Sequence, residues 1–565
     1  MPTAKGFLAH FIPQSFLSFK EGYTRRDFAA DMLSGLTVAI IALPLAMAIA
    51  IASGLPPEKG LFTAIVAGFL ISALGGSRHQ IGGPTAAFIV TVATVVSVHG
   101  YEGLVIATIM AGVILIVLGF LRAGVLITFI PYPVITGFTS GIAVLIAFSQ
   151  LKDFLGLQID ELPADFLNRL SVYLAHLDTF NVVAFAVAAA SVGIIILCRR
   201  YIPRIPGPVV VVVAMGLAAT LLGLPIETIE SRFGAIPNML PSPAWPEITL
   251  EKIRLLFPSA LTIALLAGIE SLLSAVVADG MAGTRHNSNV ELVGQGTANI
   301  ASAVFGGLCA TGAIARTAAN IHSGAKSPVS GMMHAVWLLG FIFLLAPLII
   351  KVPLAALSGI LMMIAWNMSE LKHIRSILRA PKSDAAVLFL TLILTVLVDL
   401  NVAILAGISI ASLIFIKRMM ESTQIRAFKE VVAELEGESG FDPDAISRKQ
   451  VPAGTEVYEL FGPLFFGVAD RLRDTLRLFQ EPPKVFILRM RHVPLADAAG
   501  LHALEELYHN ARKQNTVLIL SGVGAEVRRD LKKAGLTALI GEENICNHID
   551  RALARAEVVL EGGHR

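Results

Sequence analysis

Long apolar stretches alternate with short polar ones along most of the chain. Runs of about 18 or more apolar residues are long enough to cross a bilayer as helices. This pattern predicts about fourteen membrane segments. The first set comprises 33–52, 58–75, 84–98, 103–121, 130–149, 181–198 and 206–223. The second set comprises 256–278, 290–306, 312–325, 327–350, 353–368, 383–399 and 401–417. The third member of each set is short and polar for a full span.

The two sets echo each other. EKGLFTAIVAGFLISALGG (58–76) resembles ELVGQGTANIASAVFGG (291–307), and each is followed by a polar break that contains glycine. An odd number of segments separates the copies, so they have opposite orientations in the membrane. The pattern predicts a 7+7 inverted repeat, about 33–223 and 256–418, in a transmembrane domain over 33–418. Paired interrupted segments in such a repeat indicate a substrate site near the membrane midplane.

The end of the chain is polar and has a different periodicity. Residues 419–454 have the composition of a linker, and 455–565 alternate strands with amphipathic helices. Strands are expected over 455–467, 484–490 and 516–523, and helices over 469–480, 498–514 and 526–535. This order is typical of a small α/β domain.

Composition and charge agree with a membrane protein. Hydrophobic residues make up 55% of the chain and charged residues 15%, against roughly 25% charged in soluble domains. Basic residues gather in the 1–32 segment and at alternate membrane flanks, which predicts that both termini lie in the cytoplasm. The three cysteines are far apart and indicate neither a disulfide framework nor a metal site. Nucleotide-binding, zinc and catalytic-triad motifs are not recognised, so neither an enzyme, an ATP-driven pump nor a nucleic-acid partner is expected.

The two short segments are candidates for an anion site. They are predicted to start at Pro84-Thr85 and Gly312-Ala313, and a helix that starts within the membrane presents unpaired N–H groups and about half a positive charge. Pro84 suits a first helical turn. Two such starts facing each other would hold an anion. Alternatively, they are re-entrant turns that only pack.

Glu270 is the one charged residue between Leu255 and Ala278. A carboxylate at this depth is costly and indicates a functional site. It can bind and release a proton, or it can ligate sodium when ionised, with Ser274 one turn further on the same helix face. Arg316 lies four residues past Gly312 and adds charge for a divalent or carboxylate substrate. The alternatives are that Arg316 pairs with Glu270, or that it extends to the membrane interface.

His334 stands alone in an apolar run. A histidine in such a run is interpreted as a core residue with satisfied hydrogen bonds rather than as a proton relay.

Three stretches resemble the SulP (sulfate permease) family. LSGLTVAIIALPLAMAIAIASGLPPEKGLFTAIVAGFLISALGGSRHQIGGPTAAF resembles its opening signature. GIESLLSAVVADGMAGTRHNSNVELVGQGTANIASAVFGG and ATGAIARTAANIHSGAKSPVSG resemble its second-half signature. The tail is similar to that family's STAS domain. Within the family, VPLAALSGILMMIAWNMSEL and KDFLGLQ are most similar to the bacterial dicarboxylic-acid uptake branch.

The resemblance implies a polytopic α-helical membrane protein of fourteen segments, divided into core and gate domains, with a cytoplasmic STAS domain. It implies a homodimer in the bacterial inner membrane. It places an anion site between the third and tenth segments and the coupling ion at Glu270. The implied anion-site residues are Thr85, Ala86 and Ala87 facing Gly312, Ala313, Ala315 and Arg316, with Leu45 and Ile49 from the first segment.

Two departures from the family pattern bear on the substrate. Sodium-coupled bicarbonate members resemble this chain but have Asp in place of Glu270, and many relatives carry Gln and an aromatic residue in place of Leu45 and Ile49. The implied pocket is therefore more apolar and compatible with an organic anion. In the STAS domain, Asp497-Ala498-Ala499-Gly500 replaces a phosphorylatable Asp-Ser-Ser-Gly turn. That switch is expected to be absent, which leaves folding, dimer contact or docking of a cytoplasmic protein partner.

The leading hypothesis is proton-coupled uptake of a C4-dicarboxylate, fumarate or succinate, or of sulfate, by an elevator-like movement. A sodium-coupled bicarbonate symporter is the first alternative. A passive anion channel and a membrane-anchored STAS interaction protein are the others. No cofactor is expected beyond the coupling ion, H⁺ or Na⁺.

Overall fold

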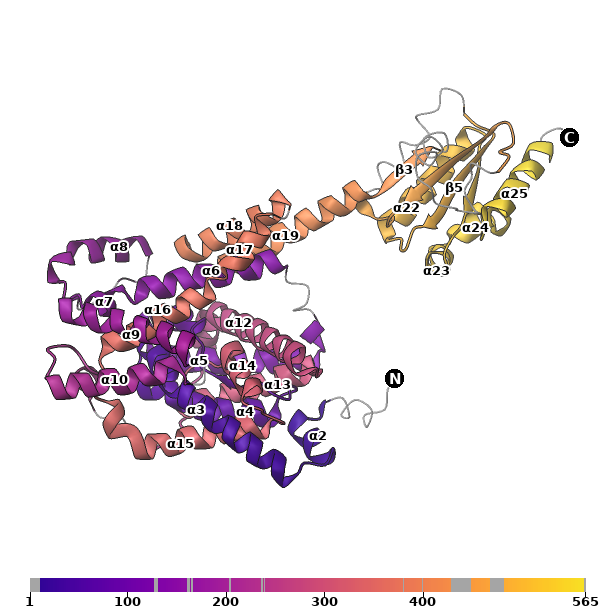
Figure 1. Cartoon of the computed structure of the whole chain (residues 1–565). Helices are drawn as coiled ribbons and strands as arrows, with labels where there is room; N and C mark the ends of the chain where they lie inside the picture. The colour runs from indigo at the N-terminus through magenta and orange to yellow at the C-terminus, as the bar shows by residue number, and fades with distance from the viewer. Residues whose placement is uncertain are drawn as a thin grey trace. The chain divides into compact units, whose positions relative to one another are not determined.

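The computed structural model describes residues 11–125, 131–159, 163, 166–202, 205–234, 237, 239–379, 381–398, 400–427, 449–467 and 482–562. It forms two compact units, Met1–Ala411 and Ser412–Arg565, each described here by itself. The first is almost entirely helical and the second is built on a sheet (Figure 1).

The helices of the first unit follow the predicted segments. In the first half they are α2 (Gln14–Lys20), α3 (Arg25–Ala52), α4 (Pro57–Leu74), α5 (Phe88–Phe120), α6 (Tyr132–Ser149), α7 (Leu151–Leu155), α8 (Phe166–Ala175), α9 (Val182–Tyr201), α10 (Gly207–Leu222) and α11 (Ile229–Phe233). In the second half they are α12 (Leu250–Ala282), α13 (Ser288–Val304), α14 (Ile314–His322), α15 (Val329–Ile349), α16 (Leu354–Met368), α17 (Leu371–Ile377), α18 (Lys382–Leu397) and α19 (Leu400–Ser422). Among the described residues, eight helical stretches are long and apolar enough to cross a membrane.

The third and fourth predicted segments are both present in α5, which is divided at Gly100, where the backbone leaves the helical conformation with φ 67° and ψ −176°. The first long helix begins earlier than predicted. It starts at Arg25 rather than at residue 33, because Thr24 and Asp27 form a capping box. Asp31, placed by sequence in a polar N-terminal segment, therefore lies inside α3. It is fully buried and accepts hydrogen bonds from the backbone N–H groups of Lys326 and Ser327.

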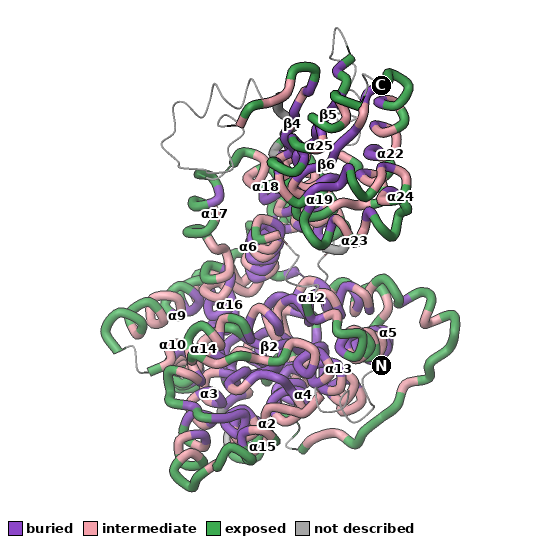
Figure 2. The backbone as a smooth tube through the Cα atoms, turned by 90° about the vertical axis from the view of Figure 1, so that its right-hand side faces the viewer, coloured by how far each residue is buried: buried purple, intermediate pink, exposed green. Residues whose placement is uncertain are grey.

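The helices pack as two bundles. In one, α5 packs on α12 and α13, while α3 and α4 pack on α15. In the other, α6 packs on α16 and α18, and α9 packs on α10 and α16. This division matches the expected core and gate. Buried backbone concentrates in α4, α12, α13 and β2 (Thr311–Gly312) at the middle of the core bundle (Figure 2).

The second unit has a five-stranded sheet in the order β3-β4-β5-β6-β7. The strands are β3 (Gln424–Ala427), β4 (Thr455–Phe461), β5 (Val485–His492), β6 (Val517–Ser521) and β7 (Ile545–Cys546). The helices are α22 (Ala498–Lys513), α23 (Ala525–Lys533), α24 (Leu536–Ile540) and α25 (Ile549–Gly562). β3 is antiparallel to β4, and the remaining neighbours are parallel.

Most of the predicted tail elements are present. The three expected strands and the helices at 498 and 526 form, whereas the helix predicted over 469–480 lies outside the described residues. The interpretation of 419–454 as a linker is wrong for Gln424–Ala427, which pairs with β4 along its whole length. Asp497 caps α22 by accepting a hydrogen bond from the N–H of Gly500 at 2.7 Å.

Candidate functional site

The two polar breaks of the sequence meet in the core bundle. β1 (Gly82–Gly83) pairs antiparallel with β2, with Gly82 opposite Gly312 and Gly83 opposite Thr311. The N–H of Ala313 extends the pairing by donating to the carbonyl of Ile81 at 2.8 Å. The two breaks therefore lie side by side, although more than 200 residues separate them.

The helices that follow the breaks start differently. α14 begins at Ile314 after Ala313, close to the predicted position. α5 begins only at Phe88, so the prediction that Pro84 opens its first turn is wrong. The pairing with β2 keeps the chain extended through Gly83, and a turn at Ala86–Ala87 precedes the first helical residue. The first N–H groups of both helices have no intrahelical partner.

α12 holds the second break in place. The Ser271 hydroxyl accepts a hydrogen bond from the N–H of Gly312 at 3.1 Å and lies 2.7 Å from Thr311 Oγ1. Thr311 Oγ1 in turn donates to the carbonyl of Ala267 at 3.0 Å. Ser271 and Thr311 are fully buried. This shell fixes the start of α14 against the middle of α12, one residue from Glu270.

Glu270 joins the two halves of the core. Its Oε2 accepts a hydrogen bond from the hydroxyl of Thr85, three residues before α5, at 3.0 Å. Within the described part of the chain, no cationic side chain forms an ion pair with Glu270.

Glu270 is partly exposed to a small cavity of about 110 Å³. The cavity is lined mainly by apolar side chains of α6 and α12 and by Ile314, and a second carboxylate, Glu370, also lines it. The carboxylate thus contacts the start of one interrupted segment and shares a cavity with the start of the other.

Arg316 neither pairs with Glu270 nor extends to the membrane interface, the two alternatives to a role in substrate binding. Its Nη2 donates to the carbonyl of Pro84 in the opposite break, and its side chain is 3% exposed. The expected ion pair with Glu270 is absent because Ile314 faces the Glu270 cavity, and a residue two positions further lies about 200° around the helix. Arg316 therefore links the second break to the first through this hydrogen bond.

The other predicted site residues lie around this junction with different exposures. Ala86, Ala87, Ala313 and Ile49 are buried, with 1–7% of their surface exposed, whereas Thr85 and Leu45 are half-buried and Ala315 is exposed. Ile49 belongs to the same apolar cluster as Ala86 and Ala87, and Leu45 packs against that cluster.

Ser274 is fully buried. Its hydroxyl lies 3.3 Å from Thr317 Oγ1, which also accepts from the N–H of Ile81. These contacts are structural, and the coupling-ion role of Ser274 stays a prediction.

A set of buried polar atoms near the junction was not anticipated. Arg316 Nη1, both side-chain polar atoms of Gln80 and both ring nitrogens of His334 have no hydrogen-bond partner among the described residues. His334 is fully buried, as expected of a core histidine, and no described residue pairs with its ring nitrogens. Such atoms are normally paired through ordered water. Gln80 carried no sequence signal beyond its place in the first polar break.

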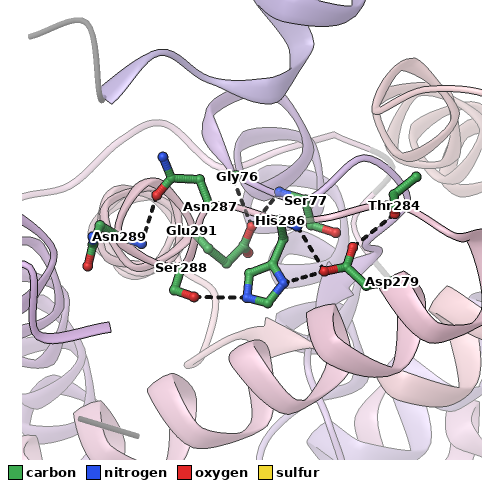
Figure 3. A network of polar contacts seen from close by, with 9 residues as sticks. All are labelled: Gly76, Ser77, Asp279, Thr284, His286, Asn287, Ser288, Asn289 and Glu291. Atoms are coloured by element: carbon green, nitrogen blue, oxygen red, sulfur yellow. Dashed lines mark hydrogen bonds and ion pairs between the residues drawn. The ribbon is translucent and has the colours of Figure 1, made fainter. Parts of the chain in front are cut away.

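The turn between α12 and α13 is fixed by a polar network (Figure 3). Asp279 accepts hydrogen bonds from Thr284 and from both the backbone and the Nδ1 of His286. Glu291 reaches across to the first half, accepting from the N–H groups of Gly76 and Ser77 at 2.9 and 3.0 Å. The network locks the two halves of the core into one body around the β1–β2 junction.

Comparisons with known proteins agree with this architecture. Residues 28–391 match the sulfate permease family and residues 447–552 match the STAS domain. A putative sulfate transporter of Bacillus subtilis, YvdB, is 41% identical over 94% of this chain and 98% of its own length. The bicarbonate transporter BicA of a Picosynechococcus species is 29% identical over 94% and 95%.

Among solved structures, murine Slc26a9, an anion transporter in the inward-facing state, superposes with a TM-score of 0.86. It covers 99% of this chain and 96% of its own, at 20% identity, which bears on the fold alone.

Proposed function

Because the chain belongs to the sulfate permease family and is therefore a multi-pass anion transporter rather than an enzyme, we propose that it imports C4-dicarboxylates together with protons. Fumarate and succinate are the leading substrates. The starts of α5 and α14 bind the anion through the N–H groups of Thr85–Ala87 and Ala313–Ala315, with Arg316 adding positive charge from behind. Glu270 binds the proton.

The contact between Glu270 and Thr85 carries this proposal. An ionised Glu270 places a negative charge beside the helix start that would bind the anion, and no cation among the described residues pairs with it. Protonation removes that charge, so anion and proton bind together more readily than either binds alone. In the sodium-coupled alternative, the ionised Glu270 carboxylate would bind sodium in place of the proton.

The apolar surroundings support an organic substrate. The Glu270 cavity is lined mostly by aliphatic and aromatic side chains, and Leu45 and Ile49 line the implied site without a hydrogen-bonding group. The carbon skeleton of a dicarboxylate packs well against such surfaces, whereas a small inorganic anion gains nothing from them.

Sulfate is the second candidate, because the YvdB relative is described as a putative sulfate transporter. Sodium-coupled bicarbonate uptake is the third, on the similarity to BicA. If the protein is a passive anion channel, its anion currents should exceed the turnover rate of a transporter by orders of magnitude. A carrier should show no such currents.

The rest of the arrangement follows from the two bundles and the charge pattern. The core bundle moves against the gate bundle in an elevator-like step, in a homodimer in the bacterial inner membrane.

Both termini lie in the cytoplasm, where the STAS domain offers a docking surface for a protein partner. The membrane-anchor alternative predicts full transport after removal of the residues beyond about 455, with loss of a partner-dependent phenotype.

Uptake of labelled fumarate into proteoliposomes tests the proposal. An inward proton gradient is imposed with sodium omitted, and excess unlabelled succinate, sulfate or bicarbonate is added in separate reactions. We expect gradient-driven accumulation that succinate blocks and that collapses when a protonophore dissipates the gradient. Uptake of sulfate but not fumarate, or uptake only with sodium, would replace the proposed substrate or coupling ion.

A further inference from the structure

A second, larger cavity lies at the ends of α3 and α6, away from Glu270. Its volume is about 500 Å³, within the range of ligand pockets, and it shares no lining residue with the Glu270 cavity. Its walls come from the end of α3, the first part of α5, and α6, α7, α8 and α11. We call it the vestibule. In the topology proposed above, these ends of α3 and α6 face the outside.

The charges that line the vestibule are mostly positive. Lys152, Arg169 and Arg232 line it together with one carboxylate, Asp153, so three cations and one anion leave a net charge of +2. They come from three helices that are separate in sequence. Clefts lined by one sign of charge concentrate oppositely charged ligands and accelerate their capture.

One of these cations is held by the carboxylate. Arg232 Nη1 lies 3.1 Å from Asp153 Oδ1, and both side chains keep partial exposure, 33% and 20%. Arg169 donates from Nε to the carbonyl of Pro163 at 2.9 Å, which leaves its terminal nitrogens to face other groups. Arg232 Nη1 also lies 3.7 Å from Glu227 Oε2. An incoming carboxylate therefore meets one guanidinium directly and competes with Asp153 and Glu227 for the other.

The floor of the vestibule points toward the proposed anion site. Ile89 and Val90, from the first turn of α5, line it, and Thr85–Ala87 immediately precede that turn. The cations and the start of the interrupted helix are thus connected through one cavity. An anion held near the cations has only a short apolar stretch to cross.

We propose that the vestibule is an outer encounter site for organic carboxylates, in which Arg169 and Arg232 bind the anion and Asp153 competes with it for Arg232. The identity of the anion as the transported substrate rests on the function proposed above. The binding property of the vestibule does not, since it follows from its own charges.

Transport kinetics test the site at low and high ionic strength. We expect Arg169→Gln to raise the KM for fumarate about threefold to tenfold at low ionic strength with little change in maximal rate, and the difference to shrink in high salt. Asp153→Asn should lower KM, because it removes the nearer of the two carboxylates that compete for Arg232. Lys252→Gln is the matched control, since Lys252 makes an exposed ion pair with Glu102 outside the vestibule. Equal KM values in all variants, or a KM that rises in Asp153→Asn, would overturn the proposal.

A second measurement does not require transport. With the three native cysteines replaced by alanine, Ser97→Cys places a thiol in the vestibule wall, and Ser242→Cys places one on an exposed loop elsewhere. Anionic and cationic membrane-impermeant methanethiosulfonates are applied from outside. We expect the ratio of anionic to cationic reaction rates to be at least about tenfold higher at Ser97→Cys than at Ser242→Cys, and to fall when Arg169→Gln is added. Equal ratios of anionic to cationic reaction rates at the two positions would refute the encounter site, even if wild-type uptake is normal. If the ratios differ as expected but fumarate uptake is absent, only the transport proposal is refuted.

Discussion

Replacing Glu270 with glutamine tests the coupling most directly. The amide keeps an oxygen that can accept from the Thr85 hydroxyl 3.0 Å away, so the local geometry should survive while the titratable charge is lost. An anion held by the N–H groups beside Thr85 would lie close to the carboxylate. Two unit charges about 5 Å apart repel by about 3 kcal/mol at an effective dielectric constant of about 20. Ionisation of Glu270 should therefore weaken anion binding by roughly 100-fold.

The assay is equilibrium binding of labelled fumarate to purified protein across a pH series, followed by counterflow in proteoliposomes. In the wild type, the Kd should rise as Glu270 ionises. In Glu270→Gln it should stay low at every pH, with exchange preserved and proton-driven accumulation lost. Glu102→Gln, which removes an exposed carboxylate paired with Lys252, should behave like the wild type. A glutamine variant that kept the wild-type pH slope would show that another group carries the proton.

Two further predictions concern the shell around the junction. A Cβ on Gly312 would overlap the buried Gln80 side chain, so Gly312→Ala should destabilise the protein by about 1–3 kcal/mol and reduce uptake. Gly280→Ala, where a Cβ meets nothing, should not do so, and an equal melting temperature for the two variants in detergent would contradict the packing argument. Ser271→Ala should cost about 1–3 kcal/mol by leaving the Gly312 N–H unpaired, whereas Ser274→Ala should cost less and keep proton-driven uptake. Loss of coupling in Ser274→Ala with normal thermal stability would return Ser274 to the coupling-ion site.

The fold and the meeting of the two polar breaks could be predicted because both depend on local or repeated patterns. Apolar runs and glycine-containing breaks are read directly from the chain, and the repeat of one break in the other half is enough to place them together. The lone carboxylate at Glu270 stood out because the cost of burying charge in a membrane is large. These predictions needed no knowledge of how side chains are oriented.

The contacts that decide chemistry could not be predicted in the same way. Whether Arg316 pairs with Glu270 depends on which face of α14 each position occupies, and that is fixed only once the β1–β2 pairing sets the start of the helix. The burial of Asp31 likewise depends on a capping box that starts α3 early and on a partner loop almost 300 residues away. The three cations of the vestibule come from separate helices, so their proximity has no signature in the sequence.

The contact between Glu270 and Thr85 also gives a reason for coupling beyond charge alone. A threonine hydroxyl has a single proton to donate. While Glu270 is ionised, Thr85 must donate that proton to the carboxylate, and its hydroxyl is unavailable to an anion at the start of α5. Once Glu270 is protonated, it can donate to Thr85 instead, and the threonine proton is released for the anion. Proton binding would then remove a repulsive charge and supply a hydrogen-bond donor in one step, through two residues that come from opposite halves of the inverted repeat.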